Sequence, residues 1–360
     1  MKLKEKVKSL PLTPGVYLIK DSCGQIIYVG KAKSLKKRVQ SYFHHSKAHP
    51  QKIKKMVANI TDFDYVLTDT EFEAFLLECK LIKKIKPHFN KKMKNPKSYT
   101  YLVIKMEDGK RVLKMSNTLL ENDRNLYFGP FLNKYTVERA INGIKEVFKI
   151  SCSNLSMKDG PCLNHSLGLC IGMCLGGTAL EQYNRILDKI IRLLNGTDTE
   201  ILEEIEHRMI TAAKQFQFET AANYRNILES INALLSKEQV IAFTEQNQNI
   251  VVIESIDDST FKLFLIKGNK LLFSEKINKR QKIESIKNIL ITYFKDSSRN
   301  SPLRISKEEI DEAQIIYSYL KSGNCRFKII PDDWLEFGKD VLMDKVVEDL
   351  IHAEHNALEI

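Results

Sequence analysis

The order of β-prone and helical runs in residues 1–95 restricts the fold of this chain more than any other feature. Two β-prone runs flank a short turn that ends in Gly24, which predicts a β-hairpin. The predicted elements are strand, strand, helix, strand and helix, at residues 15–20, 25–29, 35–43, 63–68 and 71–85. Ser34 is placed to cap the first helix, and Pro87 ends the second. Such an order with short links indicates a compact α+β domain.

Positive charge is concentrated in this domain. Residues 1–98 contain 22 Lys or Arg and 8 Asp or Glu, whereas the whole chain has a net charge of +11, so the remainder is slightly acidic. A basic part on a nearly neutral body is typical of a surface that meets phosphates, although a surface that only confers solubility has the same composition. Lys33, Lys36 and Lys37 are candidate DNA contacts within a basic run.

The cysteines indicate a metal site rather than disulfides. The N-terminal residues lack the apolar segment of a secretory signal, and no run of eighteen apolar residues occurs, so a cytoplasmic chain is expected. Disulfides are rare there. Four of the seven cysteines follow a C-x9-C-x7-C-x3-C pattern, at Cys152, Cys162, Cys170 and Cys174. Such a cluster is typical of zinc or of an iron–sulfur cluster, and the spacing alone leaves both open.

The rest of the chain divides into four predicted regions. They are a linking α+β region at 96–150, a cysteine-cluster region at 151–195, a helical hairpin at 198–236 and a second α+β domain at 240–360. The hairpin carries an apolar stripe at helical spacing from Leu202 to Phe216. A helix pair with so little core of its own either docks on a partner's helices or packs on its own chain.

Several side chains of residues 1–95 have the chemistry of a phosphodiesterase. Glu78 borders the apolar stripe of its helix, where a carboxylate is costly unless it is paired or bound to a cation. Tyr17 and Tyr28 lie on the paired strands, and a basic run from Lys31 to Arg38 follows. Each feature alone has a structural explanation, such as an ion pair or cross-strand packing. Together they offer a proton acceptor, cations for a phosphate and a carboxylate for a divalent metal.

At these residues the sequence resembles the UvrC family, whose N-terminal nuclease domain is of the GIY-YIG type. The signature triplets correspond to Gly15-Val-Tyr17 and Tyr28-Val-Gly30, with Val in place of Ile. The match extends over six blocks in order: Leu10-Pro-Leu-Thr-Pro-Gly-Val-Tyr17, Tyr28-Val-Gly-Lys-Ala-Lys33, Arg38 to Tyr42, Glu73-Ala-Phe-Leu-Leu-Glu78, Leu81-Ile-Lys-Lys84 and Pro87-His-Phe-Asn90.

The resemblance implies a role for each matching residue. Tyr28 would be the general base or would orient the attacking water, and Lys31 would favour its deprotonated form. Tyr17 would support the nucleophile by hydrogen bonding, and Arg38 would clamp the scissile phosphate. Glu78 would hold a single Mg²⁺ or Mn²⁺ ion. The remaining matches to active-site positions of the family are Tyr42 and Asn90.

The resemblance also extends to the later regions. The cysteine stretch is similar to that of the UvrC family, which implies an iron–sulfur cluster, with zinc as the alternative. The hairpin resembles the UVR motif, which implies pairing with a UvrB-like protein. The residues expected at that contact are Phe216, Phe218, Ala221 and Ala222.

The resemblance does not reach the family's ribonuclease-H-like second nuclease or its helix-hairpin-helix module, so neither is expected in this sequence. These features predict a metal-dependent endonuclease that makes one incision, 3′ of a lesion, in nucleotide excision repair, on damaged double-stranded DNA and away from membranes. Two alternatives remain: a GIY-YIG nuclease of a mobile element or restriction system, and a paralogue that binds the repair partner without cutting.

Overall fold

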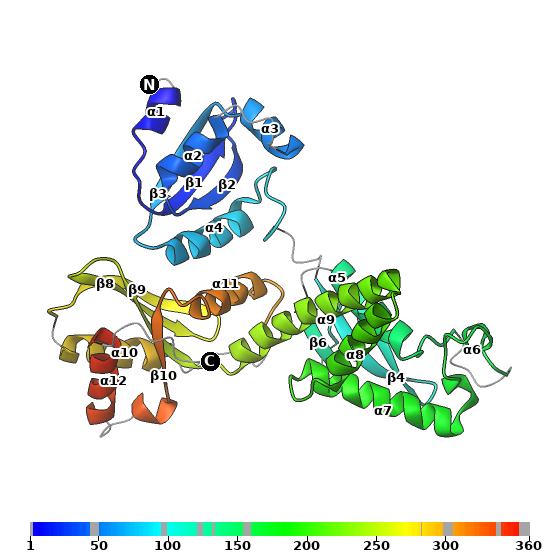
Figure 1. The fold of residues 1–360 in the computed structure, drawn as a ribbon. Helices are drawn as coiled ribbons and strands as arrows, with labels where there is room; N and C mark the ends of the chain where they lie inside the picture. The colour runs from blue at the N-terminus through cyan, green and yellow to red at the C-terminus, as the bar shows by residue number, and fades with distance from the viewer. Residues whose placement is uncertain are drawn as a thin grey trace. The chain divides into compact units, whose positions relative to one another are not determined.

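The computed structural model describes residues 3–43, 50–94, 99–120, 125–131, 134–153, 160–281, 283–297, 305–335 and 340–352. Its contacts divide the chain into two compact units. The first contains Met1–Pro96 together with Phe243–Ile360, and the second contains Lys97–Ala242. The predicted α+β class is confirmed, because helices and antiparallel sheets alternate through both units (Figure 1).

The N-terminal part of the first unit is a three-stranded antiparallel sheet covered by helices on both faces (Figure 1). The elements are α1 (Leu3–Lys8), β1 (Gly15–Lys20), β2 (Ile26–Ala32), α2 (Leu35–Phe43), α3 (Gln51–Ala58), β3 (Asp62–Leu67) and α4 (Glu71–Ile85). Successive side chains of the central strand β1 point to opposite faces of the sheet, so they pack alternately against the two helical layers. Tyr17 and Ile19 pack with α2 and α3, whereas Val16 and Leu18 pack with α4.

The predicted strands and helices of this domain are present, with three differences. The helices α1 and α3 were not predicted, since both are short and rich in lysine. Ser34 directly precedes α2, but its Oγ is buried without a hydrogen-bond partner among the described residues, so it does not cap the helix. By contrast, α4 begins at a complete capping box in which Thr70 and Glu73 satisfy each other's backbone N–H groups.

The C-terminal part of the first unit is a four-stranded antiparallel sheet in the order β10-β7-β8-β9. Its elements are β7 (Asn249–Ser255), β8 (Thr260–Lys267), β9 (Lys270–Asn278), α10 (Ile283–Ser297), α11 (Ile310–Leu320), β10 (Arg326–Ile330) and α12 (Asp340–His352). Phe261, Leu263 and Leu265 on β8 share a core with α10 and α12. The sequence pattern predicts a last helix over 342–357, whose end lies outside the described residues, whereas the strand β10 was not predicted.

The second unit is built around one hydrophobic core. Its elements are β4 (Thr100–Glu107), β5 (Lys110–Ser116), β6 (Leu126–Phe131), α5 (Lys134–Val147), α6 (Leu163–Ser166), α7 (Gly177–Leu194), α8 (Glu200–Lys214) and α9 (Phe218–Glu245). Buried residues of the sheet, the cysteine stretch and the helical hairpin all contribute to this core. The strand β6 was not predicted, and α9 continues to Glu245, beyond residue 236, where the helical hairpin was expected to end. Among the described helices, none combines the length and apolar character needed to cross a membrane.

Candidate active site

Three tyrosines meet beneath the sheet of the N-terminal domain. The hydroxyl oxygens of Tyr17 on β1 and Tyr42 on α2 lie 2.7 Å apart. The ring of Tyr28 on β2 lies 6.1 Å from that of Tyr17, measured between centroids. The Nε of Arg38 donates to the Tyr17 hydroxyl at 3.4 Å, and its guanidinium lies over the Tyr42 ring. The predicted residues Tyr17, Tyr28, Arg38 and Tyr42 are therefore brought together.

The two signature glycines are explained by close approaches. A Cβ at Gly30 would collide with the phenol of Tyr17, and a Cβ at Gly15 would collide with the backbone oxygen of Val66 on β3. Neither position can carry a side chain unless the sheet or the tyrosine moves. The triplets therefore encode the packing of the site as well as its chemistry.

In the protein without a bound metal, burial favours the protonated form of the Tyr17 and Tyr28 phenols. Desolvation, followed by the neighbouring Tyr42 and Glu78, raises the pKa of Tyr28 to about 12. Desolvation also raises the pKa of Tyr17 well above its ordinary value. Arg38 acts in the opposite direction on both but does not offset burial.

The ammonium of Lys31 contacts side chains of α4. It pairs with Glu71 on α4 at 2.7 Å and lies over the ring of Phe75. Arg38 is a cation whose charge opposes the rise in the pKa of Tyr28. Glu71 was not predicted as a site residue, although it lies seven residues before Glu78, two turns along the same helix.

Glu78 lies half-buried on α4 and faces the backbone of β2. Its Oε1 accepts the backbone N–H of Lys31 at 3.1 Å. Desolvation raises the pKa of this carboxyl, and the N–H of Lys31 and the charges of Lys31 and Arg38 only partly oppose that. A bound cation would reverse the penalty. Mg²⁺ takes oxygen ligands and often binds through one carboxylate with water and substrate phosphate, so the donor set fits it.

Asn90 holds the strand that carries Tyr28. Its Oδ1 accepts the N–H of Val29 at 3.0 Å, and its Nδ2 donates to the oxygen of Val29 at 2.9 Å. The side chain is buried, and both of its polar atoms are engaged. These two hydrogen bonds tie Asn90 to the edge strand β2.

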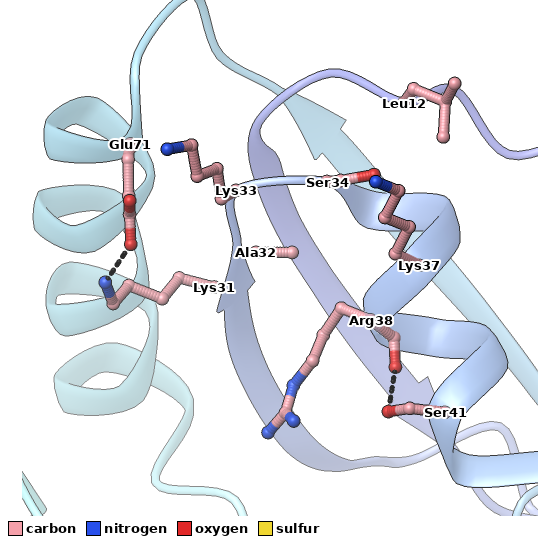
Figure 2. Close-up of a pocket in the computed structure, with 9 residues that line it drawn as sticks. All are labelled: Leu12, Lys31, Ala32, Lys33, Ser34, Lys37, Arg38, Ser41 and Glu71. Carbon is pink, nitrogen blue, oxygen red and sulfur yellow. Dashed lines mark hydrogen bonds and ion pairs between the residues drawn. The ribbon is translucent and has the colours of Figure 1, made fainter.

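A basic pocket of about 670 Å³ opens beside these groups (Figure 2). Its lining residues are Leu12, Lys31, Ala32, Lys33, Ser34, Lys37, Arg38, Ser41 and Glu71. Figure 2 shows Arg38 reaching in from α2 opposite the Lys31–Glu71 ion pair. Of the three predicted DNA contacts, Lys33 and Lys37 line the pocket and Lys36 does not. Four cations with one carboxylate suit a phosphate backbone.

The cysteine cluster is assembled in the second unit. The thiols of Cys152, Cys162 and Cys174 all lie within 4.8 Å of one another. Cys170 is buried near Cys162, and its sulfur accepts the backbone N–H of Gly172 at 3.4 Å. Desolvation opposes ionisation of Cys162, but hydrogen bonds from the backbone N–H groups of Ser153 and His165 lower the pKa of that thiol to about 6. A thiolate among thiols is suited to a soft metal.

The hairpin is divided between core and surface. The core of the second unit buries Ile201 and Ile205 of α8 together with Ile227 and Ile231 of α9. This part of the hairpin therefore packs on its own chain. At the tip, Phe216 and Phe218 are 80% and 66% exposed and contact each other edge to face. Ala221 and Ala222 follow, half-buried.

Comparison with known proteins places this geometry in a family. Residues 13–91 match the model of the UvrC-like GIY-YIG domain, and residues 99–193 match that of the UvrC/Cho excinuclease middle domain. The UvrABC system protein C of Alkaliphilus oremlandii is 35% identical over 97% of this chain and 52% of its own length. That of Caldanaerobacter subterraneus subsp. tengcongensis is 34% identical over 99% of this chain and 60% of its own length.

A solved structure is also similar to the N-terminal part. It is the GIY-YIG N-terminal endonuclease domain of UvrC from Thermotoga maritima bound to its catalytic divalent cation, magnesium. It is 36% identical, covers 25% of this chain and 97% of its own, and gives a TM-score of 0.23. The chain spans between 52% and 60% of the length of the two curated relatives. This chain therefore belongs to the UvrC family and carries its GIY-YIG endonuclease domain and its middle domain.

Proposed function

We propose that this protein is a metal-dependent DNA endonuclease of nucleotide excision repair, which acts in the cytoplasm on damaged double-stranded DNA with a UvrB-like partner. The observation that carries the proposal is the convergence of Tyr17, Tyr28, Arg38 and Glu78 beside a basic pocket. These groups come from β1, β2, α2 and α4, so only the folded domain assembles them. We assign the incision to the 3′ side of the lesion, as the family resemblance implies.

The residues divide the work of phosphodiester hydrolysis. Lys33 and Lys37 would bind the DNA backbone in the pocket, and Arg38 would contact the scissile phosphate and stabilise its added negative charge. Glu78 would hold a Mg²⁺ or Mn²⁺ ion, which when bound neutralises charge on the departing 3′ oxygen. Tyr28 would orient the attacking water, or would accept its proton where the positive charge of a bound cation offsets the desolvation of the phenol. Tyr17 and Tyr42 would fix the hydrogen-bond network around Arg38. Asn90 would keep β2 in register.

Recruitment to the lesion would use the hairpin tip. Two exposed aromatic side chains at the turn between α8 and α9 are costly in water and are typical anchors of a protein interface. We propose that Phe216 and Phe218, with Ala221 and Ala222 behind them, contact a helix pair of a UvrB-like protein. The buried half of the hairpin would supply a rigid base for that contact.

We propose an iron–sulfur cluster on Cys152, Cys162, Cys170 and Cys174, with zinc as the alternative. Three thiols lie together and the fourth lies near Cys162, so a small side-chain movement would complete the set. Iron, sulfide and zinc analysis of anaerobically purified protein, with its visible absorption spectrum, separates the two. Sulfide-free protein that contains zinc would exclude the iron–sulfur cluster.

The nuclease proposal is tested on a lesion-bearing duplex with Mg²⁺ and a UvrB-like partner. Wild type should nick one strand 3′ of the lesion, and Glu78→Gln should not, although it retains the shape and the hydrogen bond to Lys31. The exposed Glu275→Gln is the matched control and should cut like wild type. Sequence-specific cutting without the partner would indicate a mobile-element or restriction nuclease. If the wild-type protein binds the partner but does not nick the duplex, the proposal that it is an endonuclease is refuted.

A further inference from the structure

The helix that carries Glu78 is held along another face by the C-terminal part of the same unit. The ring of Phe72 on α4 stacks on Tyr319 of α11, with centroids 3.9 Å apart and planes 7° from parallel. Phe264 of β8 meets the same Phe72 ring edge to face at 5.1 Å. Further along α4, the Nζ of Lys83 pairs with Glu312 of α11 at 3.0 Å. The contacts thus extend over most of the helix.

The first turn of α4 is held by a buried lysine. Lys262 on β8 is 7% exposed and lies 2.6 Å from Asp69 and 2.9 Å from Glu73. The Oε1 of Glu73 also accepts the hydroxyl of Ser274 on β9 at 2.6 Å. Its Oε2 accepts the backbone N–H groups of Asp69 and Thr70, which begin the helix. One carboxylate therefore joins the helix cap to two strands of the C-terminal sheet.

This arrangement makes the cap depend on the sheet. A buried lysine is stable only when it is paired, and a buried carboxylate needs all its hydrogen bonds satisfied. Moving the cap away from the sheet would separate Lys262 from Asp69 and Glu73 and would take from Glu73 its partners on β8 and β9, so the two parts are joined at this point. Glu78 lies five residues after Glu73, about 7.5 Å further along a rigid helix. A shift of the first turn is therefore transmitted to the carboxylate.

We propose that Lys262 is a positioning residue of the metal site: through Glu73 and Asp69 it fixes the start of α4, and so sets where Glu78 faces Tyr28 and Arg38. The C-terminal α+β part would then be needed for catalysis without touching the DNA or the metal. This inference rests on the proposed function, because Glu78 is a metal ligand only there.

The test measures metal binding directly and uses a matched control. Mn²⁺ binding to the full chain is titrated by electron paramagnetic resonance for wild type, Lys262→Met and Lys267→Met. Lys267 lies on the same strand and is 6% exposed, but its nearby carboxylate is Asp332, away from α4. Loss of a direct hydrogen-bond partner of a metal ligand typically weakens binding by about 10- to 100-fold, and Lys262 acts one step further out, through Glu73 and the helix. We expect a weakening of about tenfold for Lys262→Met and none for Lys267→Met.

Two further measurements separate positioning from simple destabilisation. In single-turnover nicking, Lys262→Met should need more Mg²⁺ for half-maximal rate, with an unchanged KM for DNA, and Lys262→Arg should restore the midpoint. If Lys262→Met does not fold, Ser274→Ala removes one contact to Glu73 and should shift the Mn²⁺ midpoint in the same direction. An unshifted midpoint in whichever of these variants folds would overturn the inference. Wild-type Mn²⁺ binding that Glu78→Gln leaves unchanged would instead refute the proposed metal site.

Discussion

The hydroxyls of Tyr17 and Tyr42 lie 2.7 Å apart inside the N-terminal domain, although the residues are 25 positions apart in the chain. One comes from the central strand and the other from α2, so their hydrogen bond joins the sheet to the helix that carries Arg38. Because the same Tyr17 hydroxyl accepts from Arg38, a single oxygen orders both Tyr42 and the guanidinium that is proposed to contact the phosphate.

Tyr17→Phe should therefore slow nicking more than it affects folding. Loss of one buried hydrogen bond should lower the free energy of unfolding by about 1 kcal/mol. The nicking rate should fall about tenfold or more, since a hydrogen bond to a charged group contributes about 1.5–3 kcal/mol. Single-turnover rates and thermal unfolding measure both effects. Tyr65→Phe is the control, because Tyr65 opposes Tyr17 on β3 but is exposed; equal losses in both variants would contradict the proposed role.

Glu78→Gln should stabilise the metal-free protein at neutral pH. Burial raises the pKa of Glu78, so the folded state binds this proton more tightly than the unfolded state. The free energy of unfolding therefore falls as pH rises from the ordinary glutamate range through the raised pKa. The Gln variant lacks that penalty and should show a higher Tm near pH 7, with the difference disappearing at about pH 4.

Added Mg²⁺ should reverse the order of these two proteins. Binding to the folded state raises the Tm of wild type by mass action, whereas the Gln variant has no carboxylate to bind the ion. Differential scanning calorimetry with EDTA and with Mg²⁺ gives both comparisons. A Gln variant that is less stable than wild type in EDTA would show that the carboxylate has a structural partner.

Asn90→Ala should destabilise the N-terminal domain and weaken nicking together. The substitution removes two hydrogen bonds and leaves the buried N–H and C=O of Val29 without their partner. We expect a loss of about 2–3 kcal/mol in the free energy of unfolding. Chemical denaturation measures it. A stable variant without activity would instead assign Asn90 a direct contact with the reacting groups.

Phe216→Ala should weaken binding of the UvrB-like partner without changing Tm. The side chain is 80% exposed, so it contributes little to the core, whereas an aromatic anchor at an interface typically contributes about 2 kcal/mol or more. Calorimetric titration with the partner measures the affinity. Ile205→Ala, at a buried position of the same hairpin, should lower stability by about 2–5 kcal/mol. Unchanged affinity in Phe216→Ala would place the partner elsewhere.

The local pattern of the sequence was sufficient to predict most of the helices and strands and to identify the candidate catalytic residues. Alternation and helical spacing depend on neighbouring residues, which is why the hairpin of β1 and β2 and the whole of α4 were predicted. The signature glycines and tyrosines identified the family for the same reason. Elements with weak patterns were missed: α3 is short and rich in lysine, and β6 contains a glycine and a proline.

Only the tertiary structure decided which charges meet. The resemblance implied that Lys31 would act on Tyr28. In the structure its ammonium pairs with Glu71, and Arg38 is a cation whose charge opposes the rise in the pKa of Tyr17 and Tyr28. The partnership of Lys262 with Glu73 joins residues 189 positions apart, and no periodicity in the chain encodes it. Electrostatic pairing acts over a few ångströms in space. The sequence therefore determined which side chains are present and on which elements, and the packing of β8 and α4 decided which of them hold Glu78 in place.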